Sequence, residues 1–324
     1  MKTRNTAILL IGLICVLWCS AFFINPEPIR LPQTLFLDRI VDSDYLFGHN
    51  LLSAVLSGVF LLAIAASTFF FNSAFSSGIN YLLPTLYMFL VLSNPYSVWF
   101  TPFHISGLLL IWTSFYSAKY RVTGQQFGDL FMIFFFLTIS SFFYGGTIWM
   151  FPALLFINLM ASEHKFKYIV TSIVGLLLPL VLLSGINYLV NGWEDTLLLL
   201  QRYVGQLIDI EHKTIMFTAA EICRFVIIAI FTIISAYHVF SNLDRYKIVK
   251  SKSYLRVLLY LFVLLLIMLI FVSNNKYPFG IIMYFPISLL FYEYITENAK
   301  KRIGIYLFVF AIVFLAERMI YFIR

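Results

Sequence analysis

Apolar stretches long enough to cross a lipid bilayer recur along the whole chain, separated by short polar segments. Runs of about 17–25 mainly apolar residues are typical of membrane-spanning helices. The pattern predicts an all-α, polytopic transmembrane helix bundle of about eleven spans, within a range of nine to twelve. The spans cover roughly residues 7–24, 50–71, 81–98, 101–117, 129–144, 147–161, 168–190, 214–240, 254–273, 278–296 and 304–322. We expect residues 1–324 to form a single integral-membrane domain whose main partner is the lipid bilayer.

The amino-acid composition also favours a location in a membrane. Hydrophobic residues make up 61% of the chain and include 36 Phe, more than a soluble domain of 324 residues can bury. The first apolar run is longer than a signal-peptide core and no clean cleavage site follows it, so we expect a retained first helix. Residues 129–161 fit two alternatives, either two helices that turn at residues 145–146 or a re-entrant pair.

The basic residues predict the orientation. With the N-terminus in the cytoplasm, fourteen of the 22 Lys and Arg fall in inner segments, six in outer segments and the remaining two, Arg224 and Arg318, within spans. This bias towards the inside supports an odd number of spans. The net charge of +7 is spread over short loops and forms no continuous patch, so we expect no nucleic-acid partner.

The outer segments are the longer ones, at about residues 25–49 and 191–213. Within the second, residues 196–210 have the pattern of an amphipathic helix, with Leu197, Leu200, Val204, Leu207 and Ile208 on one face. Such a helix either lies flat in the outer interface or covers a cavity. The pattern leaves both arrangements open.

Four charged side chains are the clear cases of charge within predicted spans, away from the inner span ends, where charges are costly and often functional. Glu221 and Arg224 lie about 10–15 Å below the outer boundary, and Glu317 and Arg318 about 8–9 Å below it, at 1.5 Å per residue. One interpretation is a buried ionic network that joins two helices. The other is an anion site in which Arg224 and Arg318 bind a phosphate with their planar guanidinium groups.

Acidic residues gather in the first outer segment, where Asp38, Arg39, Asp42 and Asp44 lie close together in the sequence. They form a solvated loop, a divalent cation site made of paired carboxylates, or a general base with a neighbouring acid. In an extended segment Asp42 and Asp44 point to the same side, whereas in a helix Asp38 and Asp42 do. Asp42 belongs to both pairs and is therefore the strongest candidate.

This placement of acids, with the stretch "DSDY", resembles the first outer loop of membrane glycosyltransferases of the GT-C type, which use polyprenyl-phosphate-linked sugars. The resemblance implies a glycosyltransferase acting at the periplasmic face in cell-envelope glycan assembly. Its catalytic residues would be Asp42, Asp44 and Asp38, and its substrate-binding residues Arg224, Arg318, Glu221, Glu317 and Arg39. The cofactor is open, with a divalent cation as one option.

A second resemblance extends over residues 22 to 190. It is carried by "NYLLPTLYMFLVLSNPYSVWFTPFHISGLLLIW", "FGDLFMIFFFLTISSFFYGGTIWMFPALLF" and "YIVTSIVGLLLPLVLL". These stretches resemble an uncharacterised multi-pass family of inner-membrane proteins of the Bacteroidota, which implies the inner membrane of a Gram-negative cell. The alternative to an enzyme is a non-catalytic membrane subunit or scaffold for envelope biogenesis or export. A transporter is a third option, although no corresponding pair of broken helices marks a midplane site.

Overall fold

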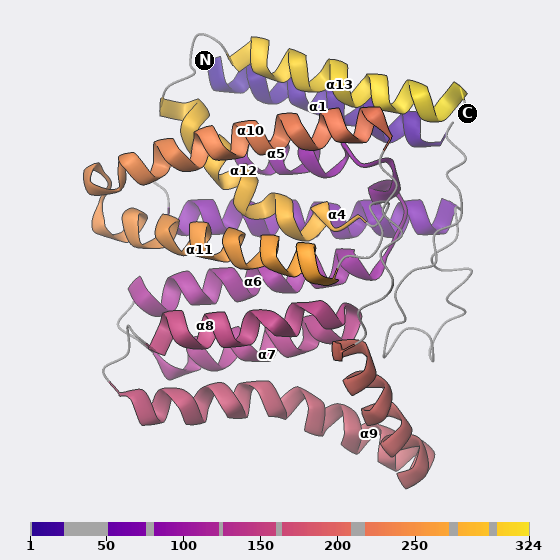
Figure 1. The fold of residues 1–324 in the computed structure, drawn as a ribbon, viewed down its shortest axis with the longest axis vertical. Helices are drawn as coiled ribbons and strands as arrows, with labels where there is room; N and C mark the ends of the chain where they lie inside the picture. Colours follow the sequence, from indigo (N-terminus) through magenta and orange to yellow (C-terminus); the bar gives the residue numbers. More distant parts are fainter. Residues whose placement is uncertain are drawn as a thin grey trace.

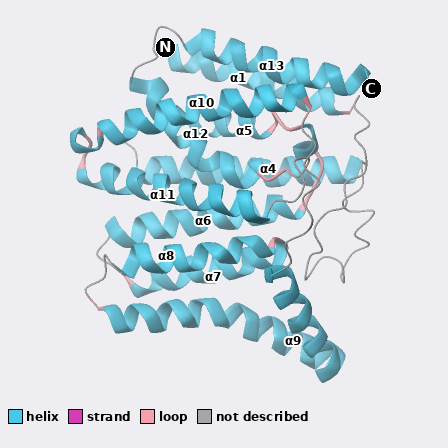
Figure 2. Ribbon diagram, viewed as in Figure 1, coloured by secondary structure: helices cyan, strands magenta, loops and turns pink. Residues whose placement is uncertain are grey.

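The computed structural model describes residues 2–22, 51–75, 81–122, 126–159, 164–208, 218–271, 278–297 and 303–323. Within these residues the chain is all-helical, with eleven α-helices and three short 3-10 helices (Figure 2). The described part of the chain contains no strand. The all-α prediction is therefore confirmed.

Each predicted span coincides with a helix or with a helix and a short 3-10 turn. The α-helices are α1 (Lys2–Ala21), α4 (Leu51–Phe75), α5 (Leu82–Val91), α6 (Pro102–Val122), α7 (Phe127–Phe143), α8 (Met150–Leu159), α9 (Lys165–Ile208), α10 (Ala219–Ser241), α11 (Ile248–Phe271), α12 (Gly280–Glu297) and α13 (Ile303–Ile323). The 3-10 helices are η1 (Pro95–Val98), η2 (Gly145–Trp149) and η3 (Leu243–Arg245). Residues 127–159 form two helices joined by η2, an arrangement that fits both alternatives given for this part of the chain.

Three of these helices are long and apolar enough to cross a membrane: Leu51–Phe75, Lys165–Leu207 and Ala219–Ser241. Together they support a membrane protein. The finer prediction of eleven crossings, with the N-terminus inside, stays a prediction.

Most helices lie side by side with similar axes, and the two termini lie at opposite ends of the bundle (Figure 1). We call the end where α1 begins and α10 meets α11 the N-terminal end. The opposite end, where α4, α6 and α10 begin and α13 stops, is the C-terminal end (Figure 1). The acidic segment joins α1 to α4, and both of these helix ends lie at the C-terminal end.

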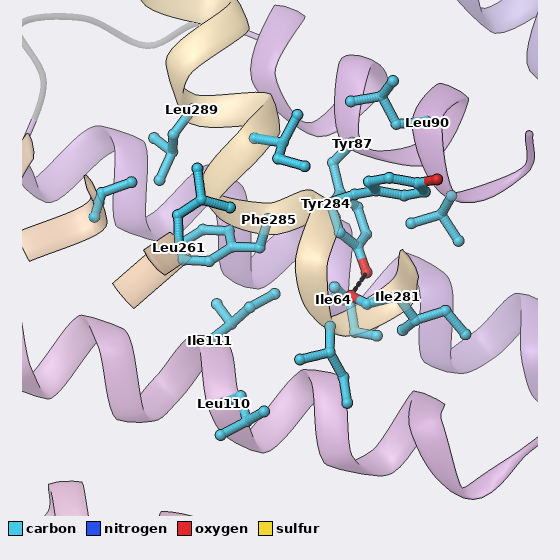
Figure 3. Packing of buried hydrophobic residues seen from close by; sticks show 14 of the residues in the cluster. Ile64, Tyr87, Leu90, Leu110, Ile111, Leu261, Ile281, Tyr284, Phe285 and Leu289 are labelled. Atoms are coloured by element: carbon cyan, nitrogen blue, oxygen red, sulfur yellow. Dashed lines mark hydrogen bonds between the residues drawn. The ribbon is translucent and has the colours of Figure 1, made fainter. Parts of the chain in front are cut away.

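Helix α12 runs through the centre of the bundle, and most of its side chains are buried. Phe285 and Leu289 pack among Ile64, Ile111 and Leu261 of neighbouring helices (Figure 3). The buried hydroxyl of Tyr87 on α5 donates a hydrogen bond of 2.8 Å to the Ile281 carbonyl of α12. Such a bond stabilises the contact because a buried hydroxyl without a partner is costly.

Small residues allow close contact between α6, α7 and α9, as is common in membrane helix bundles. The hydroxyls of Ser106 on α6 and Ser140 on α7 are 2.6 Å apart. Thr138 of α7 donates to the Leu176 carbonyl of α9 at 3.1 Å. These bonds form where side chains are short enough for two backbones to approach each other.

Helix α9 bends at Gly192, whose φ of 85° favours glycine. The predicted amphipathic helix is therefore the second arm of α9, folded back towards α7 and η2. Tyr203 in this arm packs on Phe142, and its hydroxyl is 2.8 Å from that of Ser141. Leu197 and Val204 of the predicted apolar face are exposed, which suits contact with lipid.

Replacing Gly175 with alanine is expected to destabilise the contact between α7 and α9. A Cβ atom at this position would lie 2.8 Å from the Phe131 carbonyl oxygen, a backbone atom that cannot move alone. We expect a loss of about 1–3 kcal/mol, typical of overpacking, measured by heating the protein in detergent and following monodispersity. Gly185→Ala on the same helix is the control, because no atom lies within 4 Å of a Cβ there. Equal melting of the two variants would contradict the close contact.

Reporters fused within residues 245–252 and at the C-terminus are expected to lie on opposite sides of the membrane. The connection between α10 and α11 lies at the N-terminal end of the bundle, whereas α13 stops at the other end (Figure 1). A pair of enzymatic reporters, each active on only one side, measures this. Activity of both fusions on the same side would rule out an odd number of crossings.

Candidate functional site

Four of the predicted site residues, Asp38, Arg39, Asp42 and Asp44, lie outside the described residues. The structure instead fixes the two flanks of their segment, at the end of α1 and the start of α4. The other four, Glu221, Arg224, Glu317 and Arg318, are described and buried at the C-terminal end of the bundle. The site is therefore described from these residues outwards.

Arg224 of α10 and Glu317 of α13 form an ion pair inside the bundle, with 2.7 Å between Arg224 Nη1 and Glu317 Oε1. The two residues are only 1% and 0% exposed. Arg224 Nη1 also donates to the Ser93 carbonyl at 3.3 Å, and Arg318 Nη2 donates to the Leu92 carbonyl at 2.8 Å. The charges thus join two helices to the turn that follows α5, as an ionic network was expected to do.

Glu221 has a second role at the start of α10. Its Oε2 accepts hydrogen bonds from the Thr218 backbone N–H at 2.8 Å and the Thr218 hydroxyl at 3.1 Å. Thr218 Oγ1 accepts in turn from the Glu221 N–H at 3.3 Å, which completes a capping box.

This capping box corrects the predicted depth of Glu221. The helix begins at Ala219 rather than near residue 214, so Glu221 lies about 3 Å and Arg224 about 7–8 Å along it. Six residues, about 9 Å of helix, separate Glu317 from Ile323 at the end of α13, and its depth below a membrane boundary stays a prediction. Thr218 and Glu221 are spaced as T-x-x-E, the sequence pattern of a capping box, and this pattern could have located the helix start.

Two polar atoms of the ion pair have no hydrogen-bond partner within the described residues: Arg224 Nε and Glu317 Oε2. The Tyr284 side chain lies beside the pair and close enough to interact electrostatically with both residues. Buried polar atoms without partners are uncommon and call for an explanation. The pair retains one donor and one acceptor for a further polar group.

Residues 92–104, between α5 and the first turn of α6, form an ordered hub that sequence reasoning missed. Ser97 Oγ donates to the Val91 carbonyl at 2.7 Å, and the Asn94 side chain accepts from the Tyr96 N–H at 3.0 Å. Ser57 of α4 donates to the Ser97 carbonyl at 3.0 Å. No motif signals these contacts, because single serines are common in apolar runs.

Both flanks of the acidic segment are attached to this hub. Phe22, just before the segment, packs edge-on against Trp99 with 5.8 Å between ring centroids. Just after the segment, the Ser53 hydroxyl accepts a hydrogen bond of 2.8 Å from the Phe100 N–H. The hub also supplies the carbonyls that accept from Arg224 and Arg318, so one short segment connects the acidic residues' flanks to the ionic network.

His104, in the first turn of α6, is the histidine of the hub. The structure buries it completely within the hub. The Thr101 N–H donates to its Nδ1 at 3.1 Å, and Nδ1 also lies 3.2 Å from the Thr101 carbonyl. Nε2 lies 3.1 Å from the Ser97 carbonyl and 2.8 Å from Ser57 Oγ. The ring thus connects the hub to Ser57 of α4.

Charged groups at the N-terminal end form a separate set of ion pairs. Glu293 pairs with Lys250 and accepts from the Tyr254 hydroxyl at 2.8 Å, and Asp129 pairs with Lys119 at 2.7 Å. Burial, with the negative charges of Glu293 and Glu297, raises the pKa of the Tyr246 hydroxyl. Tyr246 therefore stays protonated and donates to Glu297 Oε2 at 3.1 Å.

A divalent cation site was one of the three interpretations of the acidic segment. Among the described residues no three His, Cys, Asp or Glu side chains gather as ligands of one ion would. The divalent cation predicted for Asp42 and Asp44 thus involves residues outside them.

Comparison with known proteins adds a family but no activity. No curated protein and no solved structure matches the chain. A model of a family of unknown function, DUF6427, matches residues 29–323. This range runs from the acidic segment to the end of α13, so it includes the hub and the ionic network. The chain therefore belongs to the DUF6427 family.

Proposed function

We propose that the protein is a GT-C-like glycosyltransferase of the inner membrane that acts at the periplasmic face on a polyprenyl-phosphate-linked sugar. One observation carries the proposal. The hub at residues 92–104 fixes both flanks of the segment with Asp42 and Asp44, and its carbonyls accept hydrogen bonds from Arg224 and Arg318. The candidate acids and candidate phosphate-binding groups are thereby linked through one ordered element.

The proposed reaction transfers the sugar to an acceptor hydroxyl. Asp42 accepts the proton of that hydroxyl, whose oxygen forms a new bond to the anomeric carbon of the sugar. The bond between this carbon and the phosphate oxygen breaks, and the polyprenyl phosphate leaves with the bonding electron pair. Asp38 or Asp44 tunes the pKa of Asp42, depending on which of them is its neighbour.

The leaving phosphate gains negative charge during this step, so cationic groups nearby lower the barrier. Arg224 retains a donor at Nε, and Arg39 lies within the acidic segment. A divalent cation on the paired carboxylates would supply further positive charge. Arg224 is also paired with Glu317, so its binding and structural roles would be coupled.

The second proposed function is a non-catalytic subunit or scaffold for envelope biogenesis or export. The direct ion pair between Arg224 and Glu317, and the bond from Arg318 to the Leu92 carbonyl, favour this alternative. Groups that already bind one another hold helices together without a ligand. The two functions differ in whether Asp42 is needed once the protein is folded.

The experiment that tests the proposal is complementation of a deletion strain with the Asp42→Asn variant. Envelope glycans and glycoproteins are analysed for the missing sugar, and membrane levels of the protein are measured in parallel. A glycosyltransferase loses the sugar at normal protein level, whereas a scaffold with the same change keeps it.

A further inference from the structure

Asn72 of α4 is a buried polar side chain that has no role in the proposed glycosyl transfer. It lies three residues before Phe75, where α4 ends, and therefore at the N-terminal end of the bundle, away from the hub (Figure 1). The residue is only 1% exposed. Neither the nitrogen nor the oxygen of its side-chain amide has a hydrogen-bond partner within the described residues. Burying an amide in this state is costly, so both atoms call for a partner.

A small space lies beside Asn72, where α4 meets α11 and α12. Asn72 lines it from α4, Ser253 and Tyr254 from α11, and Leu289 from α12. All four residues are buried, so the walls of the space lie inside the bundle. A water-sized sphere finds about 10 Å³ of room there, which is enough for about one water molecule.

The chemistry of the amide selects the class of ligand. An asparagine side chain has hydrogen-bond donors on its nitrogen and an acceptor on its oxygen, and exchanging these two atoms leaves the same set of needs. A metal ion cannot accept a hydrogen bond from the nitrogen, and an anion without a proton cannot donate one to the oxygen. A water molecule does both, and it is also the ligand that the available room admits.

Two further side chains give this water polar surroundings. The Tyr254 hydroxyl donates to Glu293 Oε2 at 2.8 Å, so its oxygen can still accept a hydrogen bond. Ser253 supplies a second hydroxyl group beside the same space. Together with Asn72 these residues offer three partners, and internal water molecules typically make about three hydrogen bonds.

We propose that this space binds one water molecule, which bridges Asn72 of α4 to Ser253 and Tyr254 of α11. The N–H on the oxygen side of a primary amide points the same way as the amide oxygen, so one water molecule serves both atoms of Asn72. Its second O–H then donates to a hydroxyl oxygen of α11. The site is independent of the glycosyltransferase proposal, because it shares no residue with it.

The bridge has a consequence for α4, the helix that follows the acidic segment. Ser53 and Ser57 attach the start of α4 to the hub through hydrogen bonds of 2.8 Å and 3.0 Å. The water molecule attaches the other end of the same helix to α11. Polar contacts thus fix α4 at both ends, in a part of the bundle where most contacts are apolar and have no direction.

The test is nuclear magnetic resonance of the purified full chain in deuterated detergent, with ¹⁵N in the asparagine side chains. Magnetisation passes directly from water to an amide proton when a water molecule stays beside it for longer than the protein takes to tumble. The sign of the cross-peak in a rotating-frame experiment separates this contact from chemical exchange. We expect a direct cross-peak between water and the Asn72 amide protons. Asn72→Leu assigns the signal by removing it, and Asn72→Ser does so if the leucine variant does not fold.

Asn187 is the matched control, because it is a buried asparagine whose amide is bonded within the protein. Its nitrogen donates to Thr196 Oγ1 at 3.1 Å, and its oxygen accepts from Asn191 Nδ2 at 3.0 Å. We expect no direct cross-peak with water there. A signal at Asn72 and none at Asn187 would support the bound water. Absence of the signal at Asn72, or equal signals at the two residues, would overturn the proposal.

Discussion

Replacing Arg224 with alanine is expected to destabilise the protein by about 3–5 kcal/mol, the cost of leaving one buried charge without its partner. Glu317, which is buried, would then lose the guanidinium that pairs with its Oε1. The turn after α5 would lose one of its two arginine contacts as well. Much of the variant should therefore fail to reach a monodisperse folded state, which gel filtration after mild heating measures.

The matched control is Arg202→Ala, because Arg202 is exposed on the second arm of α9. It removes the same side chain from the same end of the bundle without separating a buried pair, so we expect little change. If Arg224→Ala and Arg202→Ala are equally stable, the ion pair is not what joins α10 to α13.

A double replacement, Arg224→Met with Glu317→Leu, separates the structural role from the functional one. Buried ion pairs can often be replaced by apolar residues of similar size without loss of stability. We therefore expect the double variant to regain most of the stability that Arg224→Ala loses. A scaffold with this change should remain functional, whereas an enzyme that binds phosphate through Arg224 should be folded and inactive.

The helices could be predicted from the sequence because each contains a long, mainly apolar run bounded by polar residues. The end of α5 is determined by local sequence signals. The predicted span 81–98 stops being α-helical at Val91. Pro95 lacks a backbone N–H and Asn94 caps the 3-10 turn, and these signals were present in the sequence. The position of the second arm of α9, after the bend at Gly192, was not predictable. The packing of Tyr203 on Phe142 determines where this arm lies.

For the site, one interpretation of the sequence was a buried ionic network that joins two helices, and the structure identifies its pair as Arg224 and Glu317. Pairs within one helix follow from spacing, but a pair between α10 and α13 depends on how the two helices meet. The hub was not predictable for the same reason. Ser53 and Ser57 contact residues forty or more positions away, and nothing in their local sequence distinguishes them from other serines in apolar runs.

The second large effect is expected from Asp42→Asn, which should reduce glycosyl transfer by about 10²–10⁴-fold, the usual contribution of a general base. Asparagine has nearly the same shape as aspartate but does not accept a proton at neutral pH, so the fold should be unaffected. The measurement is sugar incorporation into envelope acceptors, normalised to the amount of folded protein in the membrane. Normal incorporation by Asp42→Asn would exclude Asp42 as the base.

Two neighbouring variants, Asp44→Asn and Asp38→Asn, serve as controls and report the local conformation. If the segment is extended, Asp44 is the side chain beside Asp42, and its loss should shift the pH dependence of transfer while Asp38→Asn has little effect. If the segment is helical, the two effects exchange, because Asp38 is then one turn from Asp42. In either case removing a neighbouring negative charge lowers the pKa of Asp42, so the basic form persists to lower pH and the acidic limb of the profile moves down. A solvated loop predicts no change in any of the three variants, which distinguishes it from both arrangements.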